Sequence, residues 1–149
     1  MHQEWQRDGF TISTDPARLD RDAVFAFLAE SYWARGIPRD VFERSVDHAV
    51  PFGIYEGERL VGFARVVTDR ATVAYVGDVF VLEAWRGRGL SKWLMECVLA
   101  HPELQGFRRW FLLTRDAHGL YAQAGFTPLA APDRWMEKHT PNAYRTRER

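Results

Sequence analysis

The sequence predicts an α/β or mixed α+β protein in which helices are layered around one sheet. Strand-like and helical segments alternate in the second half of the chain, and two amphipathic helical segments precede them. No repeat, low-complexity tract or linker interrupts residues 9–139. We therefore expect a single domain over residues 1–139, followed by a loose polar tail at 140–149.

The composition is typical of a globular protein. The 149 residues are 46% hydrophobic and 27% charged, which excludes the disordered and fibrous classes. Twenty basic residues balance twenty acidic ones, so the chain lacks the basic excess of proteins that bind nucleic acids or membrane surfaces. We expect neither kind of partner.

No segment of the sequence predicts a metal centre, a disulfide or a membrane span. The single cysteine, Cys97, excludes an internal disulfide and a cysteine-clustered zinc site. His48, His101 and His139 have no partners at metal-ligand spacing. No apolar run approaches the roughly 20 residues of a membrane helix, and the polar N-terminus does not resemble a signal peptide. We expect a cytoplasmic protein.

The first half of the chain contains helix and hairpin signals. Gly36 and Pro38 interrupt the helical pattern, which therefore divides into two helices. The expected elements are a strand at 10–13, a helix from Asp20 to about Ala34, a second helix capped by Asp40, and a hairpin of 52–55 and 60–68 around a turn at 56–58.

The second half contains the clearest helix. Apolar residues follow Leu90 at spacings of 3, 4, 7 and 8, which is one helical face. The expected elements are a strand at 72–82, a helix at 89–100, a strand at 109–114, a helix at 118–124 closed by Gly125, and closing strands at 126–129 and 134–138.

The loop between the strand at 72–82 and the helix at 89–100 has the composition of an anion site. It contains Arg86, Gly87, Arg88 and Gly89 and continues directly into the helix. Such a loop presents backbone N–H groups at the positive end of a helix dipole, and the glycines allow close approach. The P-loop and dinucleotide motifs do not match, since the Gly-Lys-Ser/Thr ending and the third glycine are missing. A phosphate-bearing ligand is expected.

Two motifs together resemble a known family. Arg86, Gly89 and Ser91 form an Arg-x-x-Gly-x-Ser sequence similar to the acyl-coenzyme A pyrophosphate loop of GNAT superfamily N-acetyltransferases, with Ser91 replacing the usual Gly or Ala. About 30 residues downstream, Leu120–Phe126 resembles the family's Leu-Tyr-x-x-x-Gly-Phe segment. The resemblance implies the GNAT fold, a mixed and mostly antiparallel sheet flanked by helices, with acetyl-CoA as cosubstrate in a V-shaped gap between the strands ending at Leu82 and Thr114.

The resemblance also implies roles for individual residues. Peptide groups of Phe80 and Val81 would pair with the pantetheine arm, and Tyr121 would be the general acid for the departing thiolate. Asp116 or His118 would take the place of an asparagine that often contacts pantetheine in the family. The pyrophosphate would lie on Arg86, Gly87, Arg88, Gly89, Leu90 and Ser91.

The general base is open at this stage. Neutralising a lysine-like amine at pH 7 costs roughly 4–5 kcal/mol, so a base is needed, together with an oxyanion donor from the strand near 79–81. In several relatives an acid on this strand serves as base, and Asp78 is the only carboxylate there. Asp78 could instead pair with Arg65, and Gly77 stands where some relatives carry Glu. Tyr75 is a second candidate, acting through water.

The acceptor pocket is expected at the end of the first helix. Tyr32 and Trp33 precede the Gly-Pro break, where family members build this pocket, and they could hold an amine by cation–π contact or simply be core. We expect a small-molecule amine as the acceptor, because the sequence shows no extended acidic surface for a basic peptide. The amine should attack directly in a ternary complex, and the position of Cys97 on an apolar helix face agrees with the absence of an acyl-enzyme. The alternatives are a non-catalytic acyl-CoA sensor or an interaction module. A homodimer is possible from the family alone.

Overall fold

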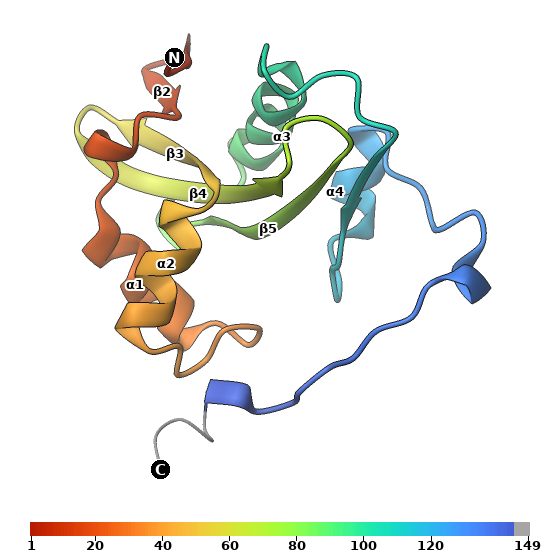
Figure 1. Cartoon of the computed structure of the whole chain (residues 1–149). Coiled ribbons are helices and arrows are strands. Elements are labelled where there is room, and N and C mark those ends of the chain that lie inside the picture. Colours follow the sequence, from red (N-terminus) through yellow and green to blue (C-terminus); the bar gives the residue numbers. More distant parts are fainter. Residues whose placement is uncertain (145–149) are drawn as a thin grey trace.

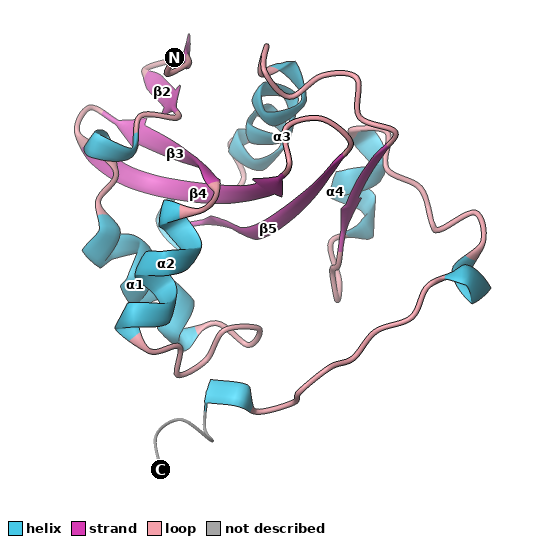
Figure 2. Ribbon diagram, in the orientation of Figure 1, coloured by secondary structure: helices cyan, strands magenta, loops and turns pink. Residues whose placement is uncertain are grey.

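The computed structural model describes residues 1–144 and contains one six-stranded sheet with helices on both faces (Figures 1 and 2). The strands are β1 (Glu4–Arg7), β2 (Phe10–Ser13), β3 (Val50–Glu56), β4 (Arg59–Thr68), β5 (Val73–Val81) and β6 (Arg109–Leu112). The helices are α1 (Arg21–Glu30), α2 (Arg39–Asp47), α3 (Leu90–Ala100) and α4 (His118–Gln123), with short 3-10 turns η1 (Pro16–Arg18), η2 (Glu83–Trp85) and η3 (Pro132–Arg134).

The spatial order of the strands follows the order of the chain. β1 to β5 are antiparallel neighbours, whereas β5 and β6 are parallel. A parallel pair needs a long crossover, and α3 supplies it. The prediction of a mixed, mostly antiparallel sheet flanked by helices is confirmed, as is the hairpin, which is the β3–β4 pair.

Two apolar clusters hold the layers together, one on each face of the sheet. On one face, α3 packs its predicted face, including Trp93, Leu94 and Cys97, onto the sheet. On the other face, α1 and α2 pack Val24, Leu28, Phe42 and Val46 against strand residues. Because β5 contributes to both clusters, it is held from both sides. No helix within residues 1–144 is long and apolar enough to cross a membrane.

Several predicted boundaries move because of local hydrogen bonds. Asp20 caps α1 by accepting from the N–H of Ala23, as expected. The helix ends at Glu30 instead of Ala34, because the N–H and hydroxyl of Ser31 both donate to the Leu28 carbonyl. The N-cap residue of α2 is Pro38, directly before the first helical residue Arg39. Asp40, which was expected to cap the helix, lies inside the first turn. β1 was not expected, since Glu4–Arg7 is a mostly exposed edge strand without apolar alternation.

The predicted closing strands at 126–129 and 134–138 are wrong. The chain beyond α4 is irregular apart from η3, and β6 forms one edge of the sheet. Pro128 and Pro132 have no N–H to donate to a strand ladder. The chain instead crosses toward the α1–α2 layer (Figure 1), where Tyr144 is partly buried against that cluster. The expected loose tail is thus packed at Tyr144, and residues 145–149 lie outside the described part.

Candidate active site

A gap opens where β5 and β6 part. The two strands pair only from Val73 and Arg109 to Val76 and Leu112, while β5 continues for five more residues. The register between β4 and β5 shifts at this height, so that one residue of β4 faces Asp78 and Val79 together. This is a β-bulge, and Asp78 adopts a left-handed φ of 54° within it. The bulge bends β5 away from β6.

The side chain of Asp78 holds the bulge from two directions. Its Oδ2 accepts from Arg65 Nε at 2.8 Å, and its Oδ1 accepts from Trp33 Nε1 at 2.8 Å. The Asp78 and Arg65 side chains are only 10% and 18% exposed. Both carboxylate oxygens of Asp78 thus already accept hydrogen bonds. The geometry therefore favours the pairing interpretation of Asp78 over the base.

The predicted anion loop follows the gap directly. Gly87 and Gly89 have φ of 80° and 75°, and Gly89 is the N-cap of α3. No atom lies within 4 Å of a Cβ built on either glycine, so the surface above the loop is open. Arg86 and Arg88 are exposed, Ser91 is half-buried and Leu90 is buried beneath the loop. Free N–H groups at a helix N-terminus, with two arginines beside them, fit a pyrophosphate.

The register decides which peptide groups of β5 face the gap. The Leu82 N–H donates to the Val61 carbonyl, so the alternation of the ladder makes Phe63 and Phe80 a hydrogen-bonded pair. Peptide groups of Phe80 thus face β4, so the geometry favours Val81 over Phe80 for the predicted contact with pantetheine. The Val81 carbonyl faces the other way and accepts from Arg86 Nε at 2.9 Å. Of the two predicted residues, only Val81 offers its peptide groups to the gap.

A cavity of about 670 Å³ lies where β5 and β6 part. It is lined by six of the predicted residues: Tyr32, Trp33, Tyr75, Asp78, Asp116 and Tyr121. His118 is not among the lining residues; it is exposed at the first position of α4. The sequence left open whether Asp116 or His118 would contact pantetheine. The geometry favours Asp116, because it lines the cavity and His118 does not.

Tyr121 is the most buried of the predicted catalytic residues. The short helix α4 carries it, its ring packs edge-on against Phe126 at 6.1 Å, and it is 8% exposed. Burial, and then the neighbouring phenols of Tyr32 and Tyr75, raise the pKa of Tyr121. The phenol therefore keeps its proton at neutral pH and can act as a donor.

Tyr75 occupies the place where an acidic residue could otherwise stand. A Cβ built on Gly77 would lie 2.8 Å from Tyr75 Cε2, so the phenol ring lies over this glycine. Burial, and then the carboxylate of Asp78, raise the pKa of Tyr75. A phenol whose ionised form is disfavoured is a poor base, so Tyr75 is better suited to shaping the cavity.

Aromatic side chains from the loop after α1 form one wall. Trp33 and Tyr32 meet edge to face at 5.1 Å, and the Arg115 guanidinium lies 3.8 Å from the centre of the Tyr32 ring. This wall thereby joins the loop after α1 to the loop after β6. Both aromatic residues remain partly exposed, so they are cavity lining and not core.

Other residues of the site come from the end of the chain. His139 and Tyr144 line the same cavity, although the sequence analysis expected only a loose tail near them. An aromatic residue in an otherwise polar tail was the only signal. The residues from 1 to 144 contain no group of three or more His, Cys, Asp or Glu side chains that could hold a metal ion. Cys97 is buried, and burial raises the pKa of its thiol to about 12.

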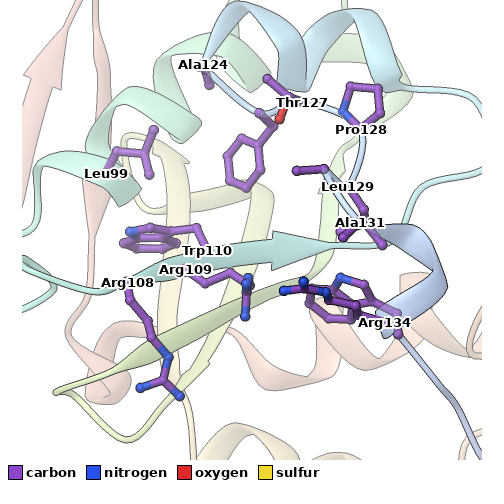
Figure 3. Close-up of a pocket in the computed structure, with 14 residues that line it drawn as sticks. Leu99, Arg108, Arg109, Trp110, Ala124, Thr127, Pro128, Leu129, Ala131 and Arg134 are labelled. Carbon is purple, nitrogen blue, oxygen red and sulfur yellow. The ribbon is translucent and has the colours of Figure 1, made fainter.

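A second cavity of about 760 Å³ lies along the open edge of β6. Arg109 and Trp110 of β6 form one side, and residues 124–131 after α4 form the other (Figure 3). None of the predicted site residues lines it. The loop from Arg86 to Ser91 lines neither of the two cavities.

Three comparisons with known proteins agree with this geometry. The model of the acetyltransferase (GNAT) family matches residues 4–126. A Gibberella zeae protein, named as a candidate acetyltransferase, is 31% identical over 144 residues, covering 81% of this chain and 80% of that protein. A crystal structure of a candidate GNAT acetyltransferase from Xanthomonas campestris is 48% identical with a TM-score of 0.90, covering 93% of this chain and 99% of that chain.

A more distant structure shares the fold alone. It is a candidate acetyltransferase from Clostridium acetobutylicum, solved with acetyl-CoA, at 13% identity and a TM-score of 0.63, covering 93% of this chain and 96% of that chain. The family model and the Gibberella and Xanthomonas relatives each span more than two thirds of the chain. The protein therefore belongs to the GNAT acetyltransferase family.

Proposed function

We propose that the protein is an N-acetyltransferase that moves an acetyl group from acetyl-CoA to a primary amine of a small molecule. The observation that carries this proposal is the position of the gap between β5 and β6. One end of the gap reaches the Gly87–Gly89 loop, and the other opens into the cavity that holds the Tyr121 phenol. A ligand with a diphosphate and a reactive far end fits such a channel.

The chain's own residues would hold the cosubstrate at two places. Backbone N–H groups of the loop from Gly87 to Ser91 would bind the pyrophosphate, with Arg86 and Arg88 adding charge. Val81 would hold the pantetheine arm. Its carbonyl would lose the hydrogen bond from Arg86 Nε and accept one from an amide N–H of the arm instead. Acetyl-CoA supplies an activated thioester, so no acyl-enzyme is required.

Tyr121 would deliver the proton to the leaving thiolate. Its hydroxyl belongs to a buried side chain that lines the cavity, and its raised pKa keeps the proton available. General acids of this kind contribute roughly 10²–10⁴-fold to the rate.

The acceptor would enter as the neutral amine. Of the two carboxylates that line the cavity, Asp78 is bound by Arg65 and Trp33, and Asp116 lies 3.6 Å from Arg115. Neither is arranged as a base. The amine would therefore lose its proton to water before it attacks the carbonyl carbon.

A second candidate function is a sensor that binds acyl-CoA without transferring the acyl group. The observation that favours it is the paired state of Asp78 beside Gly77, which leaves β5 without an available acid. An amine panel with a thiol-detecting reagent separates the two functions. An enzyme releases free thiol with at least one amine, whereas a sensor binds acetyl-CoA in calorimetry and releases thiol with none.

A further inference from the structure

We propose that the acceptor amine also carries a carboxylate and that Arg65 binds this carboxylate. The ligand class would be amino acids with an apolar side chain. The inference rests on the proposed function and specifies its substrate. It starts from the position of Arg65, a charged residue in the middle of strand β4 between the buried residues Ala64 and Val66.

Arg65 has donors that the protein does not use. Its Nε donates to Asp78, but no residue between 1 and 144 accepts from its two Nη groups. The side chain is 18% exposed and lines the cavity where β5 and β6 part. Both Nη groups reach the solvent, since the Tyr55 hydroxyl is the one buried polar side-chain atom without a partner among residues 1–144. A ligand in the cavity can therefore accept hydrogen bonds from them.

Arg65 and the Tyr75 phenol line the same cavity, which measures about 670 Å³. The residue opposite Arg65 on β5 is Gly77, which has no side chain. The neighbouring Tyr75 ring lies over that glycine. A guanidinium fork and a phenol hydroxyl thus border the same part of the cavity floor.

The acidic residues that line the cavity are each within ion-pair distance of an arginine, Asp78 of Arg65 and Asp116 of Arg115. The ion pair of Arg65 uses its Nε, which leaves its two Nη groups for a ligand. The planar guanidinium of Arg65 matches a carboxylate in shape and charge. The wall formed by Tyr32 and Trp33 offers apolar surface for a side chain.

The test compares amines that differ only by the carboxylate. Acetyl transfer by the full chain is measured for L-tryptophan against tryptamine and for L-phenylalanine against 2-phenylethylamine, at a pH adjusted so that the neutral fraction of each pair is equal. We expect kcat/KM to be at least about tenfold higher for the amino acid of each pair. Arg65→Met should remove this preference, and Arg65→Lys should retain part of it, because the charge remains and the fork is lost.

A matched control comes from the other cavity. Arg109→Met removes an arginine that lines the groove along β6 and should leave the preference unchanged. Melting temperature and acetyl-CoA binding are measured for every variant. The wild-type pairs test the inference even if Arg65→Met fails to fold.

Two outcomes would overturn the inference. If the wild-type protein acetylates tryptamine and 2-phenylethylamine as well as or better than the amino acids, the carboxylate site is wrong while the transferase proposal stands. If acetyl-CoA binds but no amine of any kind releases thiol, the transferase proposal falls and the inference falls with it.

Discussion

The cavity at the gap between β5 and β6 and the groove along β6 have similar volumes but differ in the groups that line them. The gap cavity measures about 670 Å³ and the groove along β6 about 760 Å³. The gap cavity joins segments that are far apart in the sequence, since Trp33 and Asp78 are hydrogen-bonded across 45 positions. The β6 groove is lined only by residues from 99 to 135, and its arginine–aromatic contact is Arg109 over Trp135 at 5.2 Å. Fixed polar groups, and not volume, indicate the functional cavity.

The largest expected effect tests the acid in the gap cavity. Tyr121→Phe should lower kcat by roughly 10²–10⁴-fold, since the donor to the thiolate is lost. Binding of acetyl-CoA should stay within about twofold, because the ring and its packing remain. Steady-state kinetics and calorimetry measure the two quantities. An unchanged kcat would exclude Tyr121 as the acid.

Tyr55→Phe is the matched control for this change. Tyr55 is also a buried tyrosine, but its hydroxyl has no hydrogen-bond partner among residues 1–144. Removing an unsatisfied buried hydroxyl should leave activity unchanged and stability equal or higher. Thermal unfolding and the thiol assay check both expectations.

The next effect tests the loop from Gly87 to Ser91, which we propose binds the pyrophosphate of acetyl-CoA. Gly89→Asp should weaken acetyl-CoA binding at least about 100-fold, because a carboxylate enters a site built for an anion. The fold should persist, since Asp tolerates a positive φ better than most residues. Gly106→Asp is the control: this glycine has a φ of 80° and no atom within 4 Å of a built Cβ, but it lies far along the chain from the loop. Equal affinities of the two variants would refute the loop assignment.

The pH profile tests whether the gap cavity contains a base. If the acceptor enters as the neutral amine, kcat/KM should rise about tenfold per pH unit up to the amine's own pKa. The raised pKa of Tyr121 keeps the acid protonated as pH rises, so activity should not decline until the pH exceeds about 10. A plateau that begins near pH 6 to 7 for every amine would instead reveal a base on the protein.

A smaller effect tests the bonds that fix the gap cavity. Asp78→Asn retains a side chain that tolerates φ of 54° but loses the charge that binds Arg65. We expect a loss of about 1.5 kcal/mol in the free energy of unfolding, measured in denaturant. Asp78→Ala should cost more, because it also removes the acceptor of the Trp33 N–H and strains the backbone. If Asp78→Asn abolished transfer while stability and acetyl-CoA binding stayed normal, Asp78 would be the base after all.

The smallest effect concerns the groove along β6. Trp135→Ala removes the aromatic partner of Arg109 and Phe111. Activity should stay within about twofold, and the free energy of unfolding should fall by no more than about 1 kcal/mol, since Trp135 is partly exposed. A large loss of activity would show that the groove belongs to the site and would remove the distinction between the two cavities.

Local patterns predicted the anion loop and the helix after it. The spacing of apolar residues after Leu90 gives one helical face, and that face is buried in the structure. Gly87 and Gly89 adopt the left-handed φ that their residue type permits. These features depend on neighbours within a few positions, so the sequence alone was sufficient to predict them. The same holds for the β3–β4 hairpin, whose strands are joined by a short turn.

Strand formation beyond α4 could not be predicted in this way. Residues 126–129 and 134–138 have strand-like composition, but a strand also needs a partner strand at the correct register. This segment has none, because its prolines lack an N–H to donate and the chain leaves the sheet after α4. For the same reason, the sequence did not show that His139 and Tyr144 line the gap cavity.

The sequence by itself determined the class of the fold, the family and the loop that would bind a diphosphate. Each of these depends on the spacing of residues that are close together in the sequence. Only the tertiary structure decided the state of Asp78. Its partners Trp33 and Arg65 come from another loop and another strand, and their convergence on one bulge engages both carboxylate oxygens, which favours the pairing interpretation of Asp78 over the base. A residue's chemistry depends on the atoms around it, and those atoms are assembled from distant parts of the chain.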